Sequence, residues 1–152
     1  MKIENLRHVA LAVKDLDLAI RFYVALGVKF ESSDEESGSF ISRLLGVPDC
    51  TLRTAKLRLP DGNRLELMEF VTPSISRDPG GGEMVFLGFH HFALSVSDIS
   101  AFISLVCREG GSLVSEPIRV TPQHSEYAVP AEHCYVADPF GNFIHLAQDC
   151  YD

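Results

Sequence analysis

The chain contains the same pattern twice, and this restricts the folds that it can adopt. The first copy begins with His8–Asp15 (HVALAVKD) and the second with His91–Asp98 (HFALSVSD), 83 positions later. Another matching pair, Pro60–Leu67 (PDGNRLEL) and Pro139–Leu146 (PFGNFIHL), lies 79 positions apart. Since a repeated segment indicates a repeated structural unit, we expect two equivalent modules, the first of which has a connection four residues longer.

Hydrophobic spacing predicts a strand, a helix and three further strands in each copy. In the first copy a strand-length apolar run is followed by helical spacing, with Asp15 as N-cap and Gly27 as C-terminal stop. The turn Pro60-Asp61-Gly62-Asn63 then joins the last two strands. The expected strands are 7–13, 28–32, 52–59, 64–71, 90–96, 112–119, 131–137 and 143–148, and the expected helices are 15–26 and 98–109. The sequence therefore predicts an α+β fold of two tandem βαβββ modules.

One domain over 1–152 accounts for the length, with modules at 1–71 and 89–149 and a Gly/Pro-rich linker at 72–88. Two irregular insertions are expected, at 33–51 and 120–130. In the first of them, Phe40–Leu45 is interpreted as a short helix and the acidic run Asp34–Glu36 as a solvated loop.

Composition excludes several functions. The net charge of -8 disfavours nucleic-acid binding, and no apolar run is long enough to cross a membrane. The four cysteines form no CxxC pair, and Cys107 is expected to be a buried apolar side chain of the second helix. Without a signal-peptide pattern, a cytoplasmic protein with reduced thiols is predicted.

Strand parity predicts a polar face that has room for a ligand. Alternate side chains of a strand point to opposite faces, so His8 shares a face with small alanines while Val9 and Leu11 point the other way. His91, Glu66 and His145 have the same relation to their bulky apolar neighbours. This pattern indicates a cavity wall on one face of each sheet and a packed core on the other.

These four side chains are metal-ligating types at matching positions of the two copies. A single strand histidine is more often structural, but three imidazoles and a carboxylate on one face without a common partner would cost several kcal/mol. We therefore expect His8, Glu66, His91 and His145 to bind a metal. Such a nitrogen-rich set suits Zn, Fe, Ni, Co or Mn better than Ca or Mg. A tetrahedral zinc would be saturated by four ligands, so catalysis requires higher coordination or loss of one ligand.

The strands that precede the closing strands supply further candidates on the same face. In-turn register pairs Lys56 and Arg58 of the first copy with Tyr135 and Ala137 of the second, and His133 lies on the same face. Lys56, Arg58, His133 and Tyr135 are therefore candidate substrate-binding residues. The two basic side chains suggest an anionic substrate, although a solvated surface stripe is the alternative. His90 and His124 are interpreted as structural or exposed.

These residues resemble the vicinal oxygen chelate superfamily over almost the whole chain. The resemblance rests on His8-Val-Ala-Leu-Ala-Val-Lys-Asp15-Leu16, Phe22-Tyr23, Leu26-Gly27, Leu59-Pro60-Asp61-Gly62, Leu65-Glu66-Leu67, His91 and Asp138-Pro139-Phe140-Gly141-Asn142. The superfamily includes glyoxalase I, methylmalonyl-CoA epimerase, extradiol dioxygenases, fosfomycin-resistance enzymes and bleomycin-resistance proteins. The resemblance implies a cupped mixed sheet around a divalent metal held by His8, Glu66, His91 and His145.

Position 145 departs from the family pattern, because many relatives carry glutamate where this chain has His145. In glyoxalase-like and epimerase-like members a closing-strand glutamate moves a proton, so the resemblance implies Glu66 as the catalytic base. The expected function is a metal-dependent lyase or isomerase acting on a small substrate with vicinal oxygens. An iron-dependent extradiol-type dioxygenase and a non-catalytic binding or antibiotic-resistance protein remain alternatives. A homodimer is expected, and the glycine-rich linker permits a site within one chain or one shared across the dimer.

Overall fold

The structure is a computed structural model that describes residues 2–74, 84–85, 88–121 and 130–150. The chain divides into two compact units, Met1–Arg77 and Asp78–Asp152. Each unit contains one of the repeated segments and forms its own hydrogen-bonded sheet. The α+β class and the glyoxalase-like module order predicted from the sequence are confirmed.

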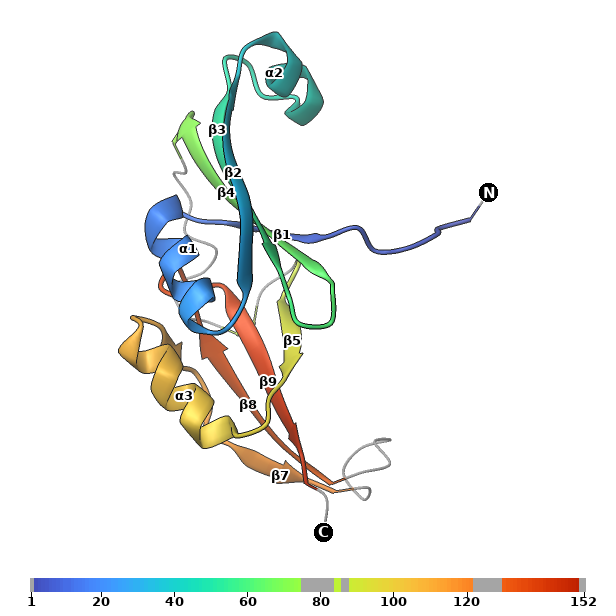
Figure 1. The fold of residues 1–152 in the computed structure, drawn as a ribbon, viewed down its shortest axis with the longest axis vertical. Coiled ribbons are helices and arrows are strands. Elements are labelled where there is room, and N and C mark those ends of the chain that lie inside the picture. The colour runs from blue at the N-terminus through green and yellow to red at the C-terminus, as the bar shows by residue number, and fades with distance from the viewer. Residues whose placement is uncertain (1, 75–83, 86–87, 122–129, 151–152) are drawn as a thin grey trace. The chain divides into compact units, whose positions relative to one another are not determined.

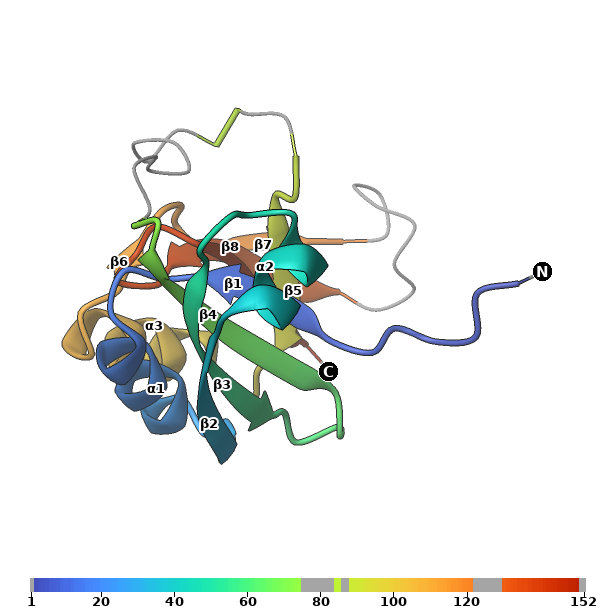
Figure 2. The same cartoon turned by 90° about the horizontal axis from the view of Figure 1, so that it is seen from above.

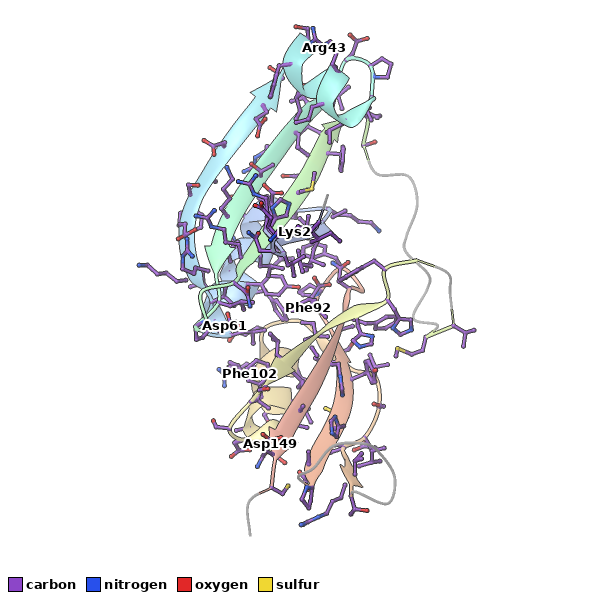
Figure 3. All side chains as sticks on the ribbon, turned by 90° about the vertical axis from the view of Figure 1, so that its right-hand side faces the viewer. Lys2, Arg43, Asp61, Phe92, Phe102 and Asp149 are labelled. Atoms are coloured by element: carbon purple, nitrogen blue, oxygen red, sulfur yellow. The ribbon has the colours of Figure 1, made fainter. Side chains whose placement is uncertain are left out.

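The first unit has four strands in the order β1-β4-β3-β2. Helix α1 packs on one face of this sheet, and α2 closes the end of the β2–β3 ribbon (Figures 1 and 2). Asp61 at the β3–β4 turn and Arg43 in α2 mark opposite ends of the sheet (Figure 3). The elements are β1 (Val9–Ala12), α1 (Leu16–Ala25), β2 (Lys29–Ser37), α2 (Ser39–Leu45), β3 (Thr51–Arg58) and β4 (Arg64–Thr72).

The second unit repeats this order, with strands arranged as β5-β9-β8-β6 and with β7 also paired to β8. Its helix α3 contacts β6, β8 and β9. In both units the first strand pairs parallel to the closing strand, and the preceding strand pairs antiparallel to it. The elements are β5 (His91–Ser95), α3 (Ile99–Arg108), β6 (Ser112–Leu113), β7 (Ile118–Val120), β8 (Ala131–Ala137) and β9 (Phe143–Asp149).

The predicted ends of the helices are confirmed in both copies. The carboxylates of Asp15 and Asp98 each accept a hydrogen bond of 2.8 Å from the backbone N–H three residues later. Gly27 and Gly110 follow the helices with positive φ, a conformation that is costly for side chains with a Cβ. Both modules therefore begin and end their helix by the same local chemistry.

The closing-strand register places the two candidate pairs at equivalent points. Glu66 lies between Ala10 of β1 and Lys56 of β3, while His145 lies between Ala93 and Tyr135. The opposite face of each closing strand is apolar and lies in the core, as predicted from parity. The fully buried side chains there are Leu65, Leu67, Ile144 and Leu146.

Three details differ from the sequence-based expectation. The acidic run Asp34–Glu36 belongs to β2 rather than to a loop, because the strand continues in register with β3 as far as Ser37. The single strand expected at 112–119 is two short strands that both pair with β8, interrupted around Pro117, which has no N–H to donate. Cys107 is exposed on α3 rather than buried.

The short helix expected at 40–45 is confirmed as α2. Most of the linker at 72–88 and of the insertion at 120–130 lies outside the described residues.

Candidate metal centre and substrate-binding surfaces

In the first unit His8 and Glu66 form a pair at the start of β1. His8 lies immediately before the strand, and its Nε2 is 3.3 Å from Oε2 of Glu66. The His8 side chain is 48 % exposed and that of Glu66 is 19 % exposed. The contact is an ion pair when His8 is protonated. Two donor atoms bound to a tetrahedral zinc at about 2.0–2.1 Å also lie about 3.3 Å apart, so this spacing fits neighbouring metal ligands.

Lys56 and Arg58 have different surroundings, although they project from the same strand. Arg58 donates through Nε to the carboxylate of Glu31 and through Nη1 to the carbonyl oxygen of Gly62, 3.0 Å away. The hydrogen bond from Arg58 lowers the pKa of Glu31, and the positive charges of Arg58, Arg64 and Lys29 lower it further. Lys56 is half exposed, and among the described residues its Nζ has a single long ion-pair contact, 4.0 Å from Asp34 Oδ2. Lys56 is therefore the more available cation for an anionic substrate group.

A hollow of about 710 Å³ lies beside Arg58 in the first unit. Its walls come from the segment that precedes β1 and from the β3–β4 turn, and they include Lys2, Arg7, Arg58 and Arg64. Neither His8 nor Glu66 lines it. The hollow is thus separate from the candidate ligand pair.

In the second unit His145 lies at the centre of an aromatic cluster. Its ring stacks on Tyr135, with centroids 4.8 Å apart and planes 16° apart, and on His133 at 5.0 Å and 23°. His145 Nε2 is also hydrogen-bonded to His133 Nδ1 over 2.9 Å. These contacts hold the imidazole ring of His145 in place on the polar face of β9.

His91 approaches the same cluster from β5. Its ring is perpendicular to those of Tyr135 and His145, at centroid distances of 5.1 and 5.6 Å. His91 Nδ1 lies 2.9 Å from His90 Nδ1, and His90 Nε2 lies 2.6 Å from the carbonyl oxygen of Met84. All four residues predicted for the site in this unit, His91, His133, Tyr135 and His145, therefore lie together in the described structure.

Burial favours the neutral form of the two candidate histidine ligands in this unit. It lowers the pKa of His91, and the neighbouring His90 lowers it further. It also lowers the pKa of His145, with His133 and His91 contributing. A neutral imidazole is the form that binds a metal, so the cluster keeps both rings in a state ready for coordination near neutral pH.

The donor types suit a transition metal, although neither unit supplies a complete set of ligands. Within the residues that the structure describes, no group of three or more His, Cys, Asp or Glu side chains is arranged to hold a metal ion. What each unit supplies is a pair at equivalent positions, His8 with Glu66 and His91 with His145. The four-residue metal site therefore stays a prediction.

His90 belongs to the cluster, although the sequence did not single it out as a site residue. It was expected to be structural or exposed, and it is half-buried and connects His91 to the backbone of Met84, which is a structural role. The signal available in the sequence was the adjacent pair His90-His91 at a position where the first copy has Arg7-His8. His124 lies outside the described residues.

Comparison with known proteins identifies the family. Residues 5–146 match the model of the Glyoxalase/Bleomycin resistance protein/Dioxygenase superfamily, and the chain belongs to this superfamily. Within that class, a curated relative is a 2-epi-5-epi-valiolone epimerase from an Actinomyces species, which is 31% identical over 120 residues. That alignment covers 75% of this chain but only 64% of the epimerase, so the chain matches less than two thirds of that relative's length.

Solved structures agree with the family assignment. A glyoxalase family protein from Bacillus cereus has a TM-score of 0.87 and 27% identity, covering 99% of this chain and 97% of its own. A glyoxalase/dioxygenase from Nostoc punctiforme has a TM-score of 0.64 and 21% identity, with coverage of 97% and 92%, which shows the shared fold alone. None of the helices in the described parts of the chain combines the length and the hydropathy that crossing a membrane requires.

Proposed function

We propose that the protein is a divalent-metal-dependent isomerase or lyase that moves a proton on a small substrate with vicinal oxygens. The observation that carries this proposal is the pair formed by His8 and Glu66, a histidine and a carboxylate at ligand spacing on the polar face of the first module. The equivalent point of the second module carries His145, so Glu66 is the carboxylate on the polar face of the two closing strands that is available as a base. The similarity to an epimerase supports the same reaction class.

In this proposal His8, Glu66, His91 and His145 are the metal ligands, within one chain or across a homodimer. A bound metal of this kind would polarise a substrate carbonyl as a Lewis acid and make the neighbouring C–H more acidic. Zn, Fe, Ni, Co and Mn suit three imidazoles and one carboxylate.

Glu66 has the central role in the proposed chemistry. Its carboxylate would accept the proton next to the carbonyl and return it to an adjacent atom, which amounts to isomerisation without oxidation or reduction. Inversion at one carbon would instead need a separate proton donor on the other side of the substrate. Lys56 would bind an anionic group of the substrate, whereas Arg58 is largely occupied by Glu31.

Metal analysis of protein purified without a histidine tag is the first test. We expect close to one transition-metal ion per site, and a large loss of metal in His8→Ala and His91→Ala. Protein that neither contains metal nor binds added Zn²⁺ or Co²⁺ would show that metal dependence is wrong and would favour a non-catalytic binding protein. Stoichiometric iron with oxygen consumption would favour a dioxygenase instead.

The proton transfer is tested with 2-epi-5-epi-valiolone in D₂O, followed by NMR. We expect Glu66→Gln to slow deuterium incorporation by about 10²–10⁴-fold while leaving substantial metal bound, because the amide keeps an oxygen ligand but cannot accept the proton. Glu69→Gln is the matched control, since Glu69 lies on the same strand but contacts Arg53 and helix α1. Undiminished exchange in Glu66→Gln would exclude Glu66 as the base, and no exchange in the unchanged protein would exclude an epimerase-like reaction on this probe.

A further inference from the structure

Two of the contacts of His90 bear on the proton positions of its neighbour His91. It immediately precedes β5 and is half-buried. Its ring stacks on Phe143, with centroids 5.9 Å apart and planes 28° apart, and lies edge-on to Tyr135 at 6.5 Å. One ring nitrogen faces the carbonyl oxygen of Met84 and the other faces Nδ1 of His91. The ring therefore bridges a backbone acceptor and a candidate metal ligand.

The chemistry of these contacts selects the positions of the protons. A carbonyl oxygen can only accept a hydrogen bond, so at 2.6 Å from Met84 the Nε2 of His90 carries the hydrogen. A neutral imidazole has one N–H, which leaves Nδ1 of His90 as an acceptor. The hydrogen in the 2.9 Å contact between the two Nδ1 atoms then belongs to His91. His91 is consequently in its Nδ1–H form, and its lone pair is on Nε2.

We propose that His90 is a positioning residue that holds His91 in the Nδ1–H tautomer and so directs the Nε2 lone pair toward a metal ion. This inference rests on the proposed function for the role of His91 as a ligand. The tautomer itself follows from the contacts of the second unit alone. Partners that hold the second nitrogen of a metal-binding histidine fix its tautomer and orientation, and losing one typically costs about 10–100-fold in metal affinity.

The first module has no hydrogen-bond acceptor of this kind in the residue before its candidate histidine ligand. The residue before His8 is Arg7, and a guanidinium has only donors, so it cannot accept an N–H from the neighbouring imidazole. His8 instead contacts Glu66 through Nε2. The two candidate histidine ligands are thus oriented by different means, a carboxylate in the first module and an imidazole in the second.

The decisive measurement is the tautomer of His91 in the metal-free protein at pH 8, read from long-range ¹H–¹⁵N NMR spectra of ¹⁵N-histidine-labelled protein. We expect a protonated Nδ1 and an unprotonated Nε2 for His91. We also expect that assignment to be lost in His90→Phe, which can keep the stacking on Phe143 but has no ring nitrogen. An Nε2–H tautomer of His91 in the unchanged protein would overturn the inference without any variant.

Metal affinity provides a second measurement, with Co²⁺ titrated into the metal-free protein. We expect His90→Phe to weaken binding about 10–100-fold. His90→Asn should stay within a few-fold of the unchanged protein, because the amide oxygen can replace the Nδ1 acceptor. Equal affinities of all three proteins would overturn the role of His90. Unchanged affinity in His91→Ala would instead contradict His91 as a ligand, which separates failure of the proposed function from failure of this inference.

Discussion

Replacing Gln148 by alanine should lower the free energy of unfolding by about 1–2 kcal/mol, because the side chain satisfies a buried end of helix α3. Gln148 Oε1 accepts a hydrogen bond of 2.6 Å from the N–H of Ile99, the first residue of the helix, which is only 1% exposed. The carboxylate of Asp98 satisfies a different N–H, that of Ala101, so it cannot compensate. Without Gln148 the N–H of Ile99 loses this acceptor where water has little access.

The size of the effect is measurable by urea denaturation followed by circular dichroism at pH 7.5. In a thermal melt, the same loss of about 1.5 kcal/mol would lower the melting temperature of a chain of this length by roughly 3–6 °C. Asp98→Ala, which removes the neighbouring cap, is a reference and should cost about 1 kcal/mol. A loss below about 0.3 kcal/mol in Gln148→Ala would refute the reasoning, since an unsatisfied buried donor costs more than that.

The first module shows why glutamine occurs at this point. Glu69, 79 positions before Gln148, is 3.4 Å from the N–H of Leu16 and is paired with Arg53 at 2.7 Å. In the second module the residue opposite Gln148 is Glu132. Gln148→Glu should therefore be less stable than the unchanged protein, because two carboxylates would face each other, and Glu132→Arg added to it should restore stability. Equal stability of Gln148→Glu with either residue at 132 would contradict this explanation.

Two further predictions concern stability. The lowered pKa values of His91 and His145 mean that the unfolded chain binds more protons than the folded one, so this contribution to stability is full above the ordinary imidazole pKa of 6.5 and is lost as pH falls from there toward the folded values. Urea midpoints measured between pH 8 and 5.5 should therefore fall with pH, and His145→Gln should make that fall smaller. An unchanged pH dependence in His145→Gln would be contrary evidence. Leu67→Ala and Leu146→Ala, at equivalent fully buried positions, should each cost about 2–5 kcal/mol in the same assay, and a cost under about 1 kcal/mol would show that the site is not in a packed core.

The agreement between sequence and structure is closest where the determining interactions are local. Asp15, Asp98, Gly27 and Gly110 bound their helices through contacts within a few residues, so their pattern could be read from the chain alone. Strand parity is local for the same reason. It placed Glu66 on the polar face and the leucines of the closing strands in the core. Because the segment is repeated, the same conclusions about helix ends and strand faces apply to the second module.

The disagreements arise where distant partners decide the outcome. The acidic run Asp34–Glu36 is a strand because β3 offers a partner in register, and no local pattern reveals that partner. Cys107 lies on a helix whose apolar stripe could be estimated only from spacing, and the packing of α3 leaves its side chain exposed. The ion pair of Arg58 with Glu31 likewise depends on a neighbouring strand, and the sequence alone did not indicate it.

By itself the sequence determined the duplicated module, the bounds of its main helices and the strand faces on which Glu66, His91 and His145 lie, because repeats, caps and alternation depend on near neighbours. Only the tertiary structure decided which side chains meet. The 3.3 Å pair of His8 and Glu66, the stacking of His145 on Tyr135 and His133, and the contacts of His90 join residues on different strands or at strand ends. Such contacts depend on how strands pair and how rings pack, and hydrophobic spacing carries no information about either.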